Sequence, residues 1–186
     1  MSMSSPQSLA SILPIRLTSY VCKGFNRGSK ELGIPTANLS PEQANRSFDD
    51  LPCGIYYGFG RIVSERDESN GNAEDNKVYM TALSIGFNPT YNNKAKTIEP
   101  HFIADRSSPD RTASICGETQ LRDFYGEEIR LSVIGYLRPE LPFEGIEKLK
   151  LAIKKDILNA EEILKDYEVD DKLIGEKEWV RGSSPG

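Results

Sequence analysis

The chain has 186 residues, with 23 Lys and Arg against 28 Asp and Glu, and 38% of its residues are hydrophobic. A chain of this length buries roughly 70% of the surface that it exposes when unfolded, so it can fold without disulfides or a structural metal. Its net charge of -5 argues against a nucleic-acid surface. No apolar run approaches the roughly 20 residues of a membrane span. We therefore expect neither nucleic acid nor membrane as a partner.

Three cysteines, Cys22, Cys53 and Cys116, are scattered along the chain without any C-x-x-C spacing. This pattern predicts reduced thiols in an intracellular compartment. The first thirty residues lack Asp and Glu, a bias shared with transit peptides, but no amphipathic Arg-rich helix precedes the predicted fold. A cytoplasmic location is the expectation.

Five segments have the short length and the period of two that are typical of β-strands. They are rich in aromatic and β-branched residues and are bounded by Gly, Pro or Asn. In chain order they cover residues 13–21, 53–63, 78–85, 97–103 and 129–137. Five or six strands in one domain predict a barrel or a sandwich.

One long segment, residues 143–166, has helical periodicity. Its apolar residues recur every three or four positions and form a single stripe on an otherwise charged helix. They are Ile146, Leu149, Ile153, Ile157, Ala160 and Leu164. Because the strands come first and the helix last, without βαβ alternation, we expect an antiparallel sheet with the helix packed outside it. The fold class is mainly β.

A single domain is predicted for residues 12–180, with flexible ends at 1–11 and 181–186. Two segments, 64–76 and 105–122, are polar and lack any periodicity. They are predicted to be surface insertions that contribute little to a core.

The segment that follows the first strand is rich in glycine and reads KGFNRGSKELGIPTAN over residues 23–38. Gly24, Gly28 and Gly33 permit positive φ and let backbone N–H groups converge on an anion, while Lys30 adds a positive charge. The run does not match the P-loop pattern G-x-x-x-x-G-K-[ST]. It predicts a phosphate-binding loop of another kind, with a plain turn as the alternative.

The end of this segment supplies two hard oxygen atoms. Pro35 fixes its own φ, and an extended continuation places Thr36 and Asn38 on one face. Mg²⁺ prefers such ligands, and a neutral pair suffices when ATP supplies the negative charge. The alternative is that both side chains only satisfy the backbone of a local turn.

Glu99 lies within the predicted strand TIEPHFI. A carboxylate in such a strand is paired, hydrogen-bonded or functional, and deprotonating a substrate hydroxyl is one such function. The alternative is a glutamate that faces water. Pro100 cannot donate a ladder hydrogen bond, so we expect Glu99 at a sheet edge or a bulge. His101, the only histidine, has no second His or Cys cluster with which to bind zinc.

Five blocks of the sequence resemble the riboflavin kinase family, in the order of that family's motifs. They are GFNRGSKELGIPTAN, CGIYYGFGRI, SIGFNPTYNNKAKTIEPHFI, FYGEEIRLSVIGYLRPE and the helix after Phe143. The resemblance implies a six-stranded antiparallel Greek-key barrel with a C-terminal helix packed outside. It also implies ATP-dependent phosphorylation of the ribityl 5′-hydroxyl of riboflavin. The expected partners are riboflavin, FMN, ATP and ADP, and a monomer is expected.

The resemblance also implies the catalytic and metal-binding roles. Glu99 would orient and deprotonate the riboflavin hydroxyl. Thr36 and Asn38 would hold Mg²⁺, or another divalent cation, against the phosphates of ATP.

The remaining roles implied by the resemblance concern substrate binding. Gly24 and Lys30 would lie in the nucleotide loop, and Tyr125 would line the nucleotide site. Arg138 and Phe143 would lie beside the flavin.

Two features of the sequence limit this transfer. Segments 64–76 and 105–122 are longer than expected for the family, and the second directly precedes FYGE, where it could alter a lid over the nucleotide. The chief alternative function is a barrel that binds flavin or nucleotide without turnover. Retention of Glu99 together with Thr36 and Asn38 argues against that alternative.

Overall fold

The computed structural model describes part of the chain. The described residues are Leu9 and residues 11–22, 38–63, 77–87, 95–103 and 125–182. Both predicted insertions, 64–76 and 105–122, lie outside the described residues, as does most of the glycine-rich segment.

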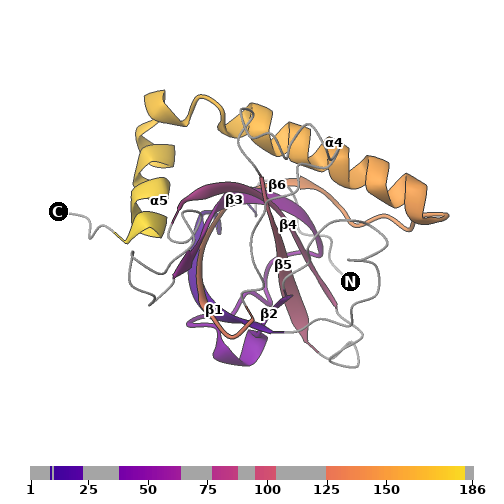
Figure 1. Ribbon diagram of the computed structural model, residues 1–186, viewed down its shortest axis with the longest axis horizontal. Helices are drawn as coiled ribbons and strands as arrows, with labels where there is room; N and C mark the ends of the chain where they lie inside the picture. The colour runs from indigo at the N-terminus through magenta and orange to yellow at the C-terminus, as the bar shows by residue number, and fades with distance from the viewer. Residues whose placement is uncertain are drawn as a thin grey trace.

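Six antiparallel strands form a barrel (Figure 1). They are β1 (Ile15–Cys22), β2 (Asn38–Leu39), β3 (Gly54–Val63), β4 (Tyr79–Phe87), β5 (Lys96–Phe102) and β6 (Glu128–Arg138). The strand order is β2-β1-β6-β3-β4-β5, and β2 also contacts β5, so that the two edges approach each other. In the order β6-β3-β4-β5 the last strand lies beside the first of three consecutive ones, which is the Greek-key arrangement. The predicted fold class is confirmed.

The barrel interior is filled by alternate side chains of the strands. Leu17, Tyr56, Leu83, Ile98 and Leu131 are all fully buried in one cluster. Because successive residues of a strand point to opposite faces, their neighbours form the outer face of the barrel. Leu9, within the stretch 1–11, is buried against the same cluster.

All five predicted strands are confirmed, with boundaries that differ by two residues or fewer. The sixth strand, β2, is only two residues long and pairs with the end of β1. A strand this short cannot show a period of two, and the sequence therefore does not reveal it as a separate element.

The predicted helix is present as α4 (Ile146–Leu164), which lies across the outside of β3, β4 and β6 (Figure 1). Ile157 and Ala160 are buried and pack on Ala82 of β4 and on Ile103, which directly follows β5. The predicted start at residue 143 is wrong, because Gly145 has φ 93° and the helix begins at the next residue. Positive φ is a conformation outside the right-handed helical region.

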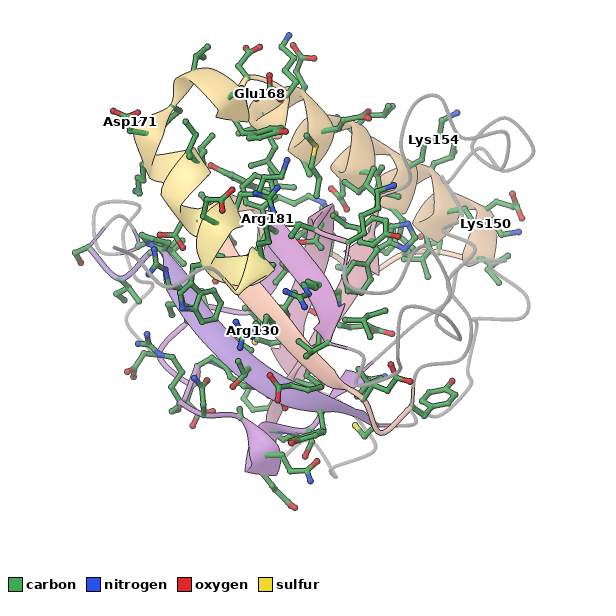
Figure 2. The ribbon with its side chains drawn as sticks, turned by 60° about the vertical axis from the view of Figure 1, so that its left-hand side comes forward. Arg130, Lys150, Lys154, Glu168, Asp171 and Arg181 are labelled. Carbon is green, nitrogen blue, oxygen red and sulfur yellow. The ribbon has the colours of Figure 1, made fainter. Side chains whose placement is uncertain are left out.

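A second helix, α5 (Asp171–Arg181), was not predicted. It follows a short 3-10 helix, Tyr167–Val169, and packs on the outer faces of β3 and β6. The bend between α4 and α5 lies near Glu168 in Figure 2. The Asp170 carboxylate accepts hydrogen bonds from the backbone N–H groups of Lys172 and Leu173, and Gly182 ends the helix with φ 96°. These are the usual start and stop signals of a helix.

Neither described helix has the length and apolar content needed to cross a membrane. The cytoplasmic location and the monomeric state stay predictions.

Candidate active site

The outer face of the barrel brings two predicted site residues into one row. Ser84 on β4 lies opposite both Glu99 on β5 and Ile55 on β3, and Ile55 lies opposite Arg138 on β6. Neighbouring strands are about 4.8 Å apart, so three spacings place Glu99 and Arg138 within about 14 Å of each other. A substrate lying across this row can therefore contact both residues.

A β-bulge turns Arg138 toward this face. In the β3·β6 ladder Tyr56 pairs with Tyr136, yet the preceding residue Ile55 pairs with Arg138, so Leu137 is an extra residue. Tyr136 packs against the inner cluster, and strict alternation would also direct Arg138 inward. Bulges redirect side chains in this way. The bulge places the Arg138 side chain outside the barrel, where it meets α4.

Glu99 lies on an edge strand, as Pro100 predicted. Among the described residues the ladder partner of β5 is β4 alone, with Pro100 opposite Leu83. Ile98 and Phe102 point into the core, so Glu99 points to the outer face, where it is half-buried. A half-buried carboxylate is shielded from bulk water yet open to a substrate.

Asn38 lies at the seam between the two edge strands. It is 4% exposed and pairs with Cys22, whose thiol donates to its backbone oxygen at 3.2 Å. Leu39 points into the core, so alternation places the Asn38 side chain on the outer face, as for Glu99 on the neighbouring β5. An amide oxygen suits Mg²⁺, which prefers oxygen ligands. The other predicted ligand, Thr36, lies outside the described residues.

Tyr125 lies at the same end of β1 as Asn38. It is 39% exposed, and the next residue, Gly126, donates its N–H to the backbone oxygen of Val21 at 2.8 Å. Gly126 has φ 82°, which glycine adopts readily. Tyr125 and Arg138 therefore lie at opposite ends of β6, with Tyr125 on the side of Asn38.

Arg138 and Phe143 are close together. The guanidinium carbon lies 5.7 Å from the centre of the Phe143 ring, within the range of a cation–π contact. Two of its nitrogens donate to the Asp156 carboxylate of α4, at 2.8 and 2.6 Å. The hydrogen bond to Asp156 is the main cause that raises the pKa of Arg138.

Glu140 brings a further carboxylate to this end of the barrel. Its oxygen Oε1 lies 2.3 Å from the position that a Cβ atom would occupy on Gly86, so the Glu140 carboxylate packs directly against that glycine. Burial raises the pKa of Glu140 above its ordinary value, although nearby Arg138 acts in the opposite direction.

The described residues therefore place Glu99 and Arg138 in one row with Phe143 beside Arg138, while Asn38 and Tyr125 lie toward the other end of β6. Gly24 and Lys30 lie outside the described residues. Sequence reasoning missed Asp156, although a signal was present. Asp156 lies three positions after Ile153 and four before Ala160, so helical spacing places a charged residue on the buried stripe.

The chain is similar to several known proteins. The family model described as "Flavokinase: Riboflavin kinase" matches residues 12–164. A riboflavin kinase of Aspergillus fumigatus is 43% identical over 157 residues, which cover 77% of this chain and 72% of the relative. A riboflavin kinase of Mus musculus is 37% identical over 152 residues, which cover 82% of each chain.

A solved structure of riboflavin kinase from Trypanosoma brucei has a similar fold. The TM-score is 0.57 at 21% sequence identity, and the match covers 93% of this chain and 91% of that one. The residues matched by the family end at the C-terminus of α4, so α5 lies beyond them.

Proposed function

Because the chain belongs to the riboflavin kinase family, we propose that it transfers the γ-phosphoryl group of ATP to the ribityl 5′-hydroxyl of riboflavin, with Glu99 as the base. The matched residues include all six strands and α4. The products are FMN and ADP.

The observation that carries the assignment of Glu99 is its position in one row with Arg138 on the outer face of the barrel. A base must lie within hydrogen-bond reach of the hydroxyl that it deprotonates. With the ring system of riboflavin beside Arg138 and Phe143, the ribityl chain extends along the row toward Glu99. The row is longer than the ribityl chain alone, so part of the ring system also lies along it.

In the reaction, the Glu99 carboxylate accepts the proton of the 5′-hydroxyl as that oxygen attacks the γ-phosphorus. The bond between the γ-phosphorus and the bridging oxygen of ATP breaks, and ADP leaves with the electron pair of that bond. Such transfers depend mainly on alignment and on stabilising charge, with little further chemistry for the protein to supply. A half-buried carboxylate on a rigid strand meets the need for alignment.

The nucleotide is placed on the side of Asn38 and Tyr125. Asn38 and Thr36 would hold Mg²⁺ or another divalent cation, which neutralises charge on the phosphate oxygens when bound. The N–H groups around Gly24 and the ammonium group of Lys30 would bind the phosphates. Tyr125, exposed beside the end of β1, offers an aromatic surface to the nucleotide.

The variant Glu99→Gln tests this proposal, because glutamine keeps the size of the side chain and cannot accept the proton. We expect kcat to fall about 100-fold or more, the usual scale for loss of a general base. Affinity for ATP and riboflavin, measured by calorimetry, should change little. Glu162→Gln is the control, since Glu162 is an exposed glutamate of α4 that no part of this proposal uses. Unchanged turnover in Glu99→Gln would contradict the role of Glu99.

A further inference from the structure

Each of the two helices buries one carboxylate against an arginine of the barrel. Asp156 of α4 is 4% exposed and binds Arg138 through two hydrogen bonds. Glu176 of α5 is 5% exposed and binds Arg16 in the same way, at 2.9 and 3.1 Å. The two pairs have the same chemistry and similar burial, but only the first contains a residue of the candidate site.

The Arg138 guanidinium is held by more than Asp156. Its Nη1 donates to the backbone oxygen of Pro139 at 3.0 Å, and its central carbon lies 5.7 Å from the centre of the Phe143 ring. Three of its nitrogens therefore already have protein partners. Arginine held in this way is a fixed, planar support rather than a mobile cation that could reach for a ligand.

Phe143 lies outside the packed core of the barrel. It lies in the irregular segment between β6 and α4, and it is half-buried. It belongs to none of the buried hydrophobic clusters formed by the described residues. The contact with Arg138 is the ring contact that the structure gives Phe143 among the described residues.

We propose that Asp156 is a positioning residue for the flavin: it fixes Arg138, and Arg138 fixes the Phe143 ring as a flat surface for the planar ring system of the substrate. This inference rests on the proposed function, which places riboflavin beside Phe143. Stacking on an aromatic ring needs defined geometry, because offset and edge arrangements are favoured over others. A ring that is free to rotate binds a planar ligand less well, since binding must then immobilise it.

The test measures riboflavin and ATP kinetics of the full chain carrying Asp156→Asn. We expect the KM for riboflavin to rise about tenfold, equivalent to about 1.4 kcal/mol, with kcat changed less than about threefold and the KM for ATP unchanged. Glu176→Gln is the matched control. It should lower the melting temperature about as much as Asp156→Asn does, without changing the KM for riboflavin or the KM for ATP. If both variants raise the KM for riboflavin equally, or neither does, the proposal is overturned.

Two further variants separate this inference from the proposed function. Phe143→Ala should raise the KM for riboflavin at least as much as Asp156→Asn does. If Phe143→Ala has no such effect, riboflavin does not lie beside this ring and the proposed placement fails. If Phe143→Ala raises the KM while Asp156→Asn does not, the placement holds and only the role of Asp156 is overturned.

Arg138→Lys extends the test should Asp156→Asn fail to fold. Lysine keeps the charge but loses the two-point hydrogen bonding and the planar face. The KM for riboflavin should rise about tenfold, as for Asp156→Asn. An unchanged KM for riboflavin in this variant would overturn the proposal.

Discussion

Helices α4 and α5 pack on the same barrel through similar ion pairs. They differ in which barrel residues these ion pairs hold in place. In the α4 pair, Asp156 binds Arg138, which lies beside Phe143 and in the same row as Glu99. In the α5 pair, Glu176 accepts hydrogen bonds from Arg16 and Ser132, which lie opposite each other on β1 and β6. The same interaction can therefore serve a site or only the fold, depending on the neighbours of the arginine.

The C-terminal end of α5 strengthens this contrast. Arg61 and Arg130 lie directly opposite each other on β3 and β6, where like charges repel. Both guanidinium groups lie close to Gly182, and Arg61 donates to the carbonyl of Arg181; Figure 2 shows Arg130 on the sheet and Arg181 on α5. The negative end of the helix dipole offsets the repulsion. Burial is the main cause that lowers the pKa of Arg61, and Arg130 adds to it.

The largest effect that we expect on the α5 side comes from Arg16→Ala. It leaves Glu176 buried without its cation and removes the contact of Arg16 with the Trp179 ring, 5.6 Å away. Breaking a buried ion pair costs about 3–5 kcal/mol; because the Arg16 side chain is 37% exposed, we expect about 2 kcal/mol. Thermal unfolding should show a fall of about 4–8 °C. The exposed Arg46→Ala serves as control, and a changed KM for riboflavin in Arg16→Ala would contradict the contrast between the helices.

A smaller effect is expected from Asp170→Ala, which removes the side-chain cap of α5. The carboxylate accepts from two backbone N–H groups, at 2.9 and 3.2 Å, and losing such a cap costs about 1 kcal/mol. Hydrogen exchange should show faster opening of the first turn of α5 while α4 stays protected. Asp171→Asn, one residue later, should change stability by only a few tenths of a kcal/mol. Equal loosening of both helices would show that they unfold as one unit.

The smallest effect concerns Glu140, on the α4 side. Because folding raises the pKa of this carboxyl, the folded state favours the protonated form, and the stability that this provides is lost as the pH rises through the raised pKa. Glu140→Gln should therefore match the wild type near pH 4 and be slightly more stable near pH 7, by less than about 1 kcal/mol for this exposed residue. Urea titrations at both pH values measure the difference. A wild type that is more stable than the variant near pH 7 would show that attraction to Arg138 outweighs burial.

The sequence predicts the parts of the fold that have a strong local pattern. Strands β3 and β6 alternate clearly because one face of each fills the barrel, and the apolar stripe of α4 contains Ile157, Ala160 and Leu164. Helix α5 was not predicted, because its buried face includes a charged residue, Glu176, which interrupts the apolar pattern. Its partner Arg16 is 160 residues away, and no local pattern reveals such a pair.

The candidate site was predicted only in part, for a related reason. Glu99 and Arg138 were singled out individually, but their position in one row depends on the register of three strand pairs and on the bulge at Leu137. A single extra residue reverses the direction of every side chain that follows it, so such a bulge cannot be inferred from alternation alone. The proposed role of Asp156 likewise depends on a contact between two distant elements.

The most direct test of the account is product analysis with the purified wild-type chain, ATP, riboflavin and Mg²⁺. Chromatography with mass detection should show FMN and ADP formed in equal amounts, with neither product formed when riboflavin or the metal is omitted. Binding of both ligands without FMN would identify a barrel that binds without turnover. ADP formed without FMN would identify hydrolysis of ATP by water. Either result would contradict the proposal that this protein transfers a phosphoryl group from ATP to riboflavin.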